Sequence, residues 1–90
     1  MKATIRTPEA RGLAMRMEKH FGHKVAVERR DGVVRVTIPP GRFELEPGDD
    51  ELEVRLEPAG AAQLPRLQEV VTTHLERFAR SPIEIVWYAP

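Results

Sequence analysis

Apolar and polar residues alternate along six short stretches of the chain, and turn-forming residues separate these stretches. Such alternation puts apolar side chains on one face of a β-strand and polar side chains on the other. In the fifth stretch, for example, Leu52, Val54 and Leu56 alternate with charged residues. Asp31 and Gly32 form a dipeptide typical of a two-residue hairpin turn. The pattern predicts strands over residues 3–6, 24–30, 33–38, 42–46, 51–57 and 83–88.

In two longer stretches apolar residues recur at helical spacing instead. The first helix is predicted to have Thr7 as its N-cap and Pro8 in its first turn, and to end at Gly22, a residue that readily adopts positive φ. The second helix is predicted over residues 61–80, with Pro65 in the first turn, where backbone N–H groups have no partner in the helix. The inward positions of helices and strands define one expected core: Leu13, Met17, Phe21, Val36, Leu52, Val54, Leu67, Val71, Leu75, Phe78 and Ile85.

The order of the predicted elements is βαββββαβ, which indicates one α+β domain over residues 1–90. Because the strands are apolar on one face only, both amphipathic helices must cover that face. We therefore expect an antiparallel sheet of five or six strands with two helices on one face, in a TATA-binding-protein-like plan. A ferredoxin-like fold with an inserted hairpin is the alternative. The other face of the sheet would carry charged side chains in cross-strand ion pairs.

Composition excludes several classes of function. Basic and acidic residues balance at 14 each, whereas nucleic-acid-binding proteins normally carry a basic excess, so we expect no sequence-specific nucleic-acid partner. The absence of cysteine excludes disulfides, thiolate nucleophiles and thiolate metal sites. No apolar run approaches the roughly 20 residues of a membrane helix, and no signal peptide is apparent, so we expect a cytoplasmic protein with no membrane partner. No motif assigns a catalytic residue or a cofactor.

The three histidines are the candidates for a site. His20 and His23 lie at the end of the first predicted helix, and His74 lies in the second. On a helical wheel, at about 100° per residue, His20 and His74 lie on the flanks of their apolar faces, with offsets of the same sign. These flanks can face each other only if the helices are antiparallel. The pattern leaves open structural imidazoles at the margin of the core, a metal or small-ligand site, and acid–base catalysis.

The histidines belong to motifs that resemble a known family. The motif HFGHKV at residues 20–25 with VE at 27–28, the motif HLERFA at residues 74–79, and Trp87 are similar to the small prokaryotic family called domain of unknown function 2218. The resemblance covers nearly the whole chain and implies no established activity. Related domains lie beside or are fused to siderophore-interacting flavoproteins, which implies an iron-acquisition setting. Family members often have a Phe-Gly pair and a cysteine in the middle strands, from which residues 38–43 depart, so no role of that cysteine is transferred.

Three functional hypotheses follow. The first is a non-enzymatic binding or accessory module in iron or siderophore handling, with a siderophore-interacting flavoprotein as its partner. The second is a histidine-centred metal or small-ligand site, with or without catalysis. The third is a self-associating module, a homodimer that uses Trp87, Tyr88 and the last predicted strand as its interface. For the second hypothesis the candidate ligands are His20, His23 and His74, and the supporting candidates are Lys24, Glu28 and Arg77.

Overall fold

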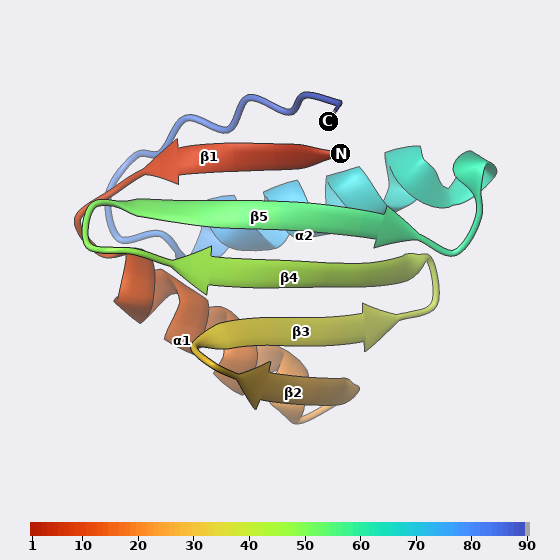
Figure 1. The fold of residues 1–90 in the computed structure, drawn as a ribbon, viewed down its shortest axis with the longest axis horizontal. Helices are drawn as coiled ribbons and strands as arrows, with labels where there is room; N and C mark the ends of the chain where they lie inside the picture. Colours follow the sequence, from red (N-terminus) through yellow and green to blue (C-terminus); the bar gives the residue numbers. More distant parts are fainter. Residues whose placement is uncertain (90) are drawn as a thin grey trace.

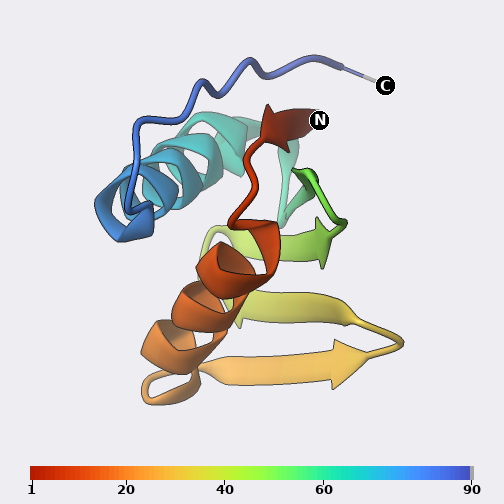
Figure 2. The same ribbon diagram turned by 90° about the vertical axis from the view of Figure 1, so that its left-hand side faces the viewer.

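The computed structural model describes residues 1–89 as a five-stranded antiparallel sheet with two helices on one face (Figure 1). In chain order the elements are β1 (Lys2–Arg6), α1 (Ala10–Gly22), β2 (Ala26–Arg30), β3 (Val33–Ile38), β4 (Gly41–Pro47), β5 (Glu51–Pro58), the short 3-10 helix η1 (Ala61–Gln63) and α2 (Leu64–Phe78). The strands lie in the order β1-β5-β4-β3-β2. Figure 2 shows both helices on the same side of the sheet. The predicted α+β class, the antiparallel sheet and the placement of the helices are confirmed.

The core lies between the helices and the inward face of the sheet. Strand β5 buries Leu52, Val54 and Leu56, as its alternation predicts, and β4 contributes Phe43, the largest fully buried side chain. Nine of the eleven expected core residues are buried, and the exceptions are Phe78 and Ile85, which are partly buried against the cluster. Phe78 is the last residue of α2, so the helix does not continue beyond it to cover the rest of its ring.

The hairpin between β2 and β3 has the predicted turn. Asp31 and Gly32 both adopt positive φ, 52° and 80°, as a type I′ turn requires. Arg30 and Val33 therefore pair directly across the turn, and β3 has the predicted bounds. Here a local sequence signal was sufficient to determine the register of two strands.

Both helices differ from the prediction at their ends. Helix α1 begins at Ala10 rather than Pro8, because the Thr7 hydroxyl accepts a hydrogen bond from the N–H of Glu9 (3.1 Å), which makes a turn before the helix. Gly22 is the last residue of α1, but it is not one of the glycines with positive φ. Helix α2 begins after the 3-10 turn and ends at Phe78 because Ala79 is extended, with ψ of 135°. Pro65 lies in the first turn of α2, as predicted.

The Glu9 carboxylate joins the start of α1 to the chain that leaves α2. It accepts hydrogen bonds from the guanidinium of Arg16, the backbone N–H of Arg80 (3.1 Å) and the hydroxyl of Ser81 (3.1 Å). Burial acts to raise the pKa of Glu9, but these hydrogen bonds together hold it below its ordinary value. Deprotonated Glu9 thus anchors the base of the C-terminal segment.

The prediction of a last strand over residues 83–88 is wrong. Within residues 1–89 this segment is extended and runs alongside β1, but a single bridge between Lys2 and Tyr88 is the only pairing between the two (Figure 1). Its alternating side chains Ile83, Ile85 and Trp87 are partly buried against the core, and the indole N–H of Trp87 donates to the Thr72 hydroxyl (2.9 Å). The alternation therefore reflects side-chain packing rather than a strand ladder.

The observed element order is βαββββα, which agrees with the TATA-binding-protein-like plan by element order alone. The ferredoxin-like alternative is wrong for the described chain, because it requires a strand after the second helix. None of the helices in residues 1–89 is long and apolar enough to cross a membrane.

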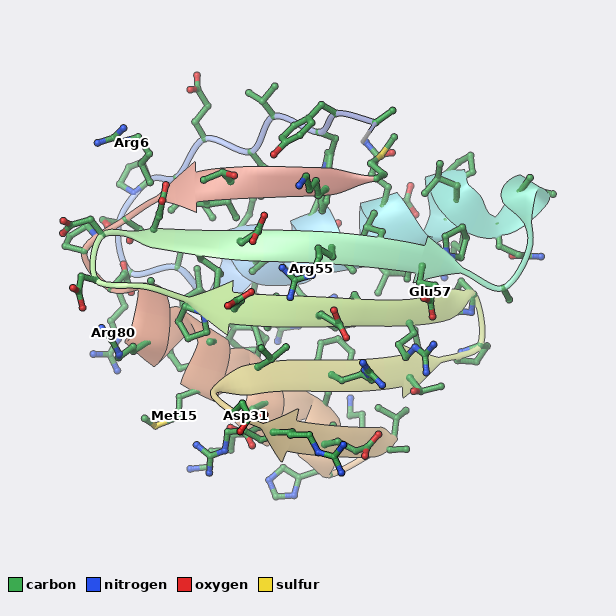
Figure 3. The ribbon with its side chains drawn as sticks, viewed as in Figure 1. Arg6, Met15, Asp31, Arg55, Glu57 and Arg80 are labelled. Atoms are coloured by element: carbon green, nitrogen blue, oxygen red, sulfur yellow. The ribbon has the colours of Figure 1, made fainter. Side chains whose placement is uncertain are left out.

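The face of the sheet away from the helices carries the expected cross-strand ion pairs. Arg55, at the middle of this face in Figure 3, contacts Glu44 (3.1 Å) and Glu46 (3.0 Å) on β4 and Glu53 (2.9 Å) on its own strand. Arg35 also donates to Glu44 (2.8 Å) from the neighbouring strand. The hydrogen bond from Arg35 is the main reason that the pKa of Glu44 lies below its ordinary value. The charged face is therefore largely paired within itself.

Candidate functional site

The two helices run antiparallel, which is the condition for the histidine flanks to meet. Contacts between the helices and their flanking residues pair rising residue numbers with falling ones. Glu9, just before α1, binds Arg80, just after α2; the guanidinium of Arg16 donates to the carbonyl of Phe78 (2.9 Å); and His20 lies against His74. A rising residue number in α1 thus corresponds to a falling one in α2. The packing brings His20 and His74 together.

An aromatic cluster surrounds the two imidazoles. The ring centroids of His20 and His74 are 5.2 Å apart. The ring of His20 is 5.0 Å from that of Phe78, and the ring of His74 is 4.8 Å from that of Phe21. Phe21 continues the cluster inward to Phe43 at 5.4 Å. These distances are those of packed aromatic pairs, so the cluster holds both imidazoles in place.

The ring nitrogens of the pair remain available to a ligand. Nδ1 of His74 lies 2.7 Å from the carbonyl of Val70, and because a carbonyl only accepts, Nδ1 carries the proton. In the neutral ring Nε2 of His74 is then an acceptor. Among residues 1–89, the ring nitrogens of His20 have no hydrogen-bond partner, and no side-chain nitrogen is both buried and unpartnered. The nitrogens without a partner therefore reach solvent at the seam between the helices.

The surroundings of His20 are electropositive. Burial is the largest influence on its pKa and lowers it below the ordinary value of about 6.5. The next largest influences are Lys24, His74, Arg77 and His23, and each of them also lowers this pKa. Because its pKa is lowered, His20 is neutral near pH 7, and the cations Lys24 and Arg77 would attract a negatively charged group beside it.

The remaining candidate residues lie around the imidazole pair or away from it, not within it. His23 and Lys24 are exposed just after α1 and act on His20 through their charge. The Arg77 guanidinium lies over the ring of Phe78, 5.7 Å from its centroid. Glu28 lies with Arg35 and Arg55 on the charged face of the sheet, so the structure does not bring it to the imidazoles.

The described part of the chain offers few further donors for a metal ion. Within residues 1–89 no group of three or more histidine, aspartate or glutamate side chains is placed to hold one ion. The imidazole pair would supply two nitrogen ligands, and a bound ion would take its other ligands from solvent or from a second molecule. Structural zinc sites are usually four-coordinate.

An open groove of about 670 Å³ lies beside His74 and was not predicted from the sequence. We call it the proline groove. Its apolar walls come from the end of α1, the turn between β3 and β4, the segment after β5, and α2; they are Phe21, Ile38, Pro39, Pro40, Ala59 and Val70. Its polar groups are Gln63, Arg66 and His74. No local pattern marks the groove, because it joins four segments that are distant in sequence.

The lowered pKa of His20 predicts a loss of stability in acid. In the unfolded chain His20 has its ordinary pKa of about 6.5. Below that pH the unfolded chain therefore binds a proton at His20 that the folded protein does not yet bind. The stability that neutral His20 contributes to the folded protein is therefore fully present above about pH 6.5. It is lost as the pH falls from there through the lower pKa that His20 has in the folded state. Urea denaturation between pH 8 and pH 4.5 measures this loss.

The matched variants for this prediction are His20→Gln and His23→Gln. We expect His20→Gln to flatten the part of the stability profile that lies below pH 6.5, because it removes the half-buried ring whose pKa is lowered. His23 is exposed, so His23→Gln should keep the profile. An unchanged profile in His20→Gln would contradict the assignment.

Comparison with known proteins agrees with the resemblance. The family profile described as "Uncharacterized protein conserved in bacteria (DUF2218)" matches residues 2–88. The NMR structure of PA4090 from Pseudomonas aeruginosa is similar, with a TM-score of 0.74 and 31% sequence identity, over 97% of this chain and 94% of that one. None of the curated proteins matches the chain.

Proposed function

The chain belongs to the DUF2218 family, and we propose that it is a small binding module that holds an organic anion at the seam between α1 and α2, without catalysing a reaction. The observation that carries the proposal is the imidazole pair. The ring centroids of His20 and His74 lie 5.2 Å apart, and the cations Lys24 and Arg77 are among the largest charge influences on the pKa of His20.

The electrostatics favour an anion over a bare metal ion. Lys24 and Arg77 both lower the pKa of His20, so they would also repel a cation placed beside its ring. A carboxylate or similar group would be attracted by the same charges and would accept a hydrogen bond from the ring N–H of His20, while the N–H of His74 stays with the carbonyl of Val70. The seam is also partly apolar, since Phe21 and Phe78 flank the pair, and ionic contacts are stronger where water is partly excluded.

The surroundings of the pair support binding rather than catalysis. A catalytic histidine is normally oriented by a third group and lies within hydrogen-bond reach of a nucleophile. Here Nδ1 of His74 is held by a carbonyl of its own helix, and the chain's one serine, Ser81, is engaged with Glu9. The iron-acquisition setting implied by the family belongs to the same proposal, because an anionic iron chelate carries the charge that these cations attract.

The test is an NMR titration of isotope-labelled protein with acetate, benzoate and phosphate, read on the ring signals of the histidines. We expect a saturable shift of His20 and His74 with at least one carboxylate. Affinity should fall about tenfold or more, which is roughly 1.4 kcal/mol, when either ring is replaced by glutamine. His23→Gln is the matched control and should change affinity little, since His23 lies outside the ring cluster.

Two results would contradict the proposal. One is the absence of saturable shifts at the histidines with all three anions. The other is affinity that is unchanged in the folded His20→Gln, His74→Gln double variant, because binding would then not depend on the pair. Amide spectra of each variant report whether the fold is retained.

Metal binding is the second candidate function, and the convergence of two imidazoles favours it. Zinc bonds to histidine nitrogen at about 2 Å, and two rings in contact can share one ion. Titration with Zn²⁺ of protein purified without a histidine tag tests this candidate. A stoichiometric ion that is lost in both His20→Gln and His74→Gln would favour the metal over the organic anion.

A further inference from the structure

The proline groove adjoins the imidazole pair through His74 and Phe21, which belong to both. An anion at the seam would therefore lie at the end of a largely apolar groove. Its volume of about 670 Å³ lies within the roughly 300–1,000 Å³ range of small-molecule sites. The groove is thus large enough for the body of an organic ligand whose charged group lies near the helices.

The charge of the groove selects a carboxylate. Its lining contains Arg66 and His74 but no aspartate or glutamate. Arg66 pairs with Glu69 one turn along α2 at 2.9 Å, and both side chains are mostly exposed, 65% and 69%. Exposed pairs of this kind contribute little to stability, so a ligand carboxylate can replace Glu69 at low cost. The guanidinium can hold a carboxylate through two parallel hydrogen bonds.

The walls of the groove favour a flat apolar body. Pro39 and Pro40 line the groove with rigid rings from the turn between β3 and β4, and Val70 lines it from α2. A hydrogen bond from the N–H of Ala59 to the carbonyl of Pro40 (2.9 Å) holds this turn against the segment after β5. Phe21 and His74 supply aromatic rings at the inner end, where a planar ring can stack or pack edge to face. Rigid walls of this kind lose little conformational entropy when they bind a rigid ligand.

We infer that the ligand of this module is an aromatic carboxylic acid, with its ring in the proline groove against His74 and its carboxylate on Arg66, about two helical turns from His74 along α2. This inference rests on the proposed function: it keeps the anion against the imidazole pair, specifies its chemical class, and assigns its carboxylate to Arg66 rather than to an imidazole. It makes Arg66 a binding residue, although Arg66 lies outside the family motifs at residues 20–28 and 74–79.

The experiment compares three carboxylates by NMR titration: benzoate, cyclohexanecarboxylate and acetate. Benzoate should bind at least about tenfold more tightly than acetate and more tightly than cyclohexanecarboxylate, because only benzoate presents a planar ring to the groove. It should shift the amide signals of residues 59–63 and 41, and its ring protons should show contacts with the methyl groups of Ile38 and Val70.

Arg66→Gln should weaken benzoate binding about tenfold. Arg11→Gln is the matched control, because Arg11 is also an exposed, ion-paired arginine, 64% exposed and 3.0 Å from Asp49, but it is not among the residues that line the groove. Both variants remove one surface charge, so a general charge effect would appear in both and would overturn the inference.

The outcomes separate this inference from the proposed function. If acetate and benzoate bind equally and both depend on His20 and His74, the anion-binding function stands and the aromatic class is wrong. If benzoate binds but Arg66→Gln has no effect and the groove amides do not shift, the placement in the groove is wrong. If no carboxylate binds, both fail.

Discussion

Replacing Phe43 with alanine should cost about 3–5 kcal/mol of unfolding free energy, the range for truncating a fully buried aromatic residue. Phe43 is 0% exposed and is the largest of the fully buried side chains. Its ring packs 5.4 Å from that of Phe21, which in turn packs 4.8 Å from His74. The cavity left by alanine would therefore also loosen the support of the imidazole pair. Urea denaturation measures the loss, and NMR ring signals of His74 report the effect on the site.

Two variants serve as controls for Phe43→Ala. Phe43→Leu keeps most of the buried volume and should lose less stability. Met15→Ala changes a side chain whose residue is 59% exposed and should stay within about 0.5 kcal/mol of the parent. A loss below about 1 kcal/mol for Phe43→Ala would mean that the ring does not lie at the centre of the core.

Replacing Gly41 with alanine should cost roughly 2–4 kcal/mol, for two reasons that act together. Gly41 has φ of 152°, a conformation that residues with a side chain rarely adopt. A Cβ at this position would also overlap the carbonyl oxygen of Glu57 and lie 2.7 Å from Cα of Pro58. Both are backbone atoms of the neighbouring strand, so a rotamer change cannot relieve the contact and strands β4 and β5 must separate.

Gly22→Ala is the matched control, since Gly22 is the last residue of α1 and a Cβ there would meet nothing within 4 Å. This change should leave stability equal or raise it by about 0.5–1 kcal/mol, because alanine favours the helix. Urea denaturation of both variants makes the comparison. Equal stability of Gly41→Ala and the parent would show that the turn relaxes without cost.

The Gly41→Ala change should also weaken benzoate binding, because Pro39 and Pro40 in the same turn line the groove.

Alternation and turn chemistry were sufficient to predict most of the sheet. The strand β3 and the Asp31-Gly32 turn agree with the prediction, and the other four strands of the sheet differ from it by one or two residues at their ends. These features are determined locally, because side chains alternate with every residue of a strand and φ is limited residue by residue. The apolar faces of the two helices were also predictable, down to buried Met17 and Val71. The helix ends were less predictable, because the Thr7 hydroxyl accepts a hydrogen bond from the N–H of Glu9 and forms a turn before the helix begins, instead of capping a helix that starts at Pro8.

The candidate site was only partly predictable. The helical wheel placed His20 and His74 on flanks that meet if the helices are antiparallel, but periodicity within each helix carries no information on the direction of the other. Packing on the sheet determined that direction and brought the rings to 5.2 Å. Packing also left Glu28 on the opposite face, although it follows the first histidine motif closely in sequence.

The sequence by itself determined which residues face the core, where the chain turns, and that its charges balance. The tertiary structure alone decided that the two helices are antiparallel, that residues 83–88 pack by their side chains without forming a ladder with β1, and that four distant segments enclose the proline groove. The physical reason is how far apart in the chain the residues that determine each feature lie. Strand and helix periods repeat within a few residues, whereas helix direction, pairing at a sheet edge and the shape of a groove depend on contacts between residues far apart in the chain.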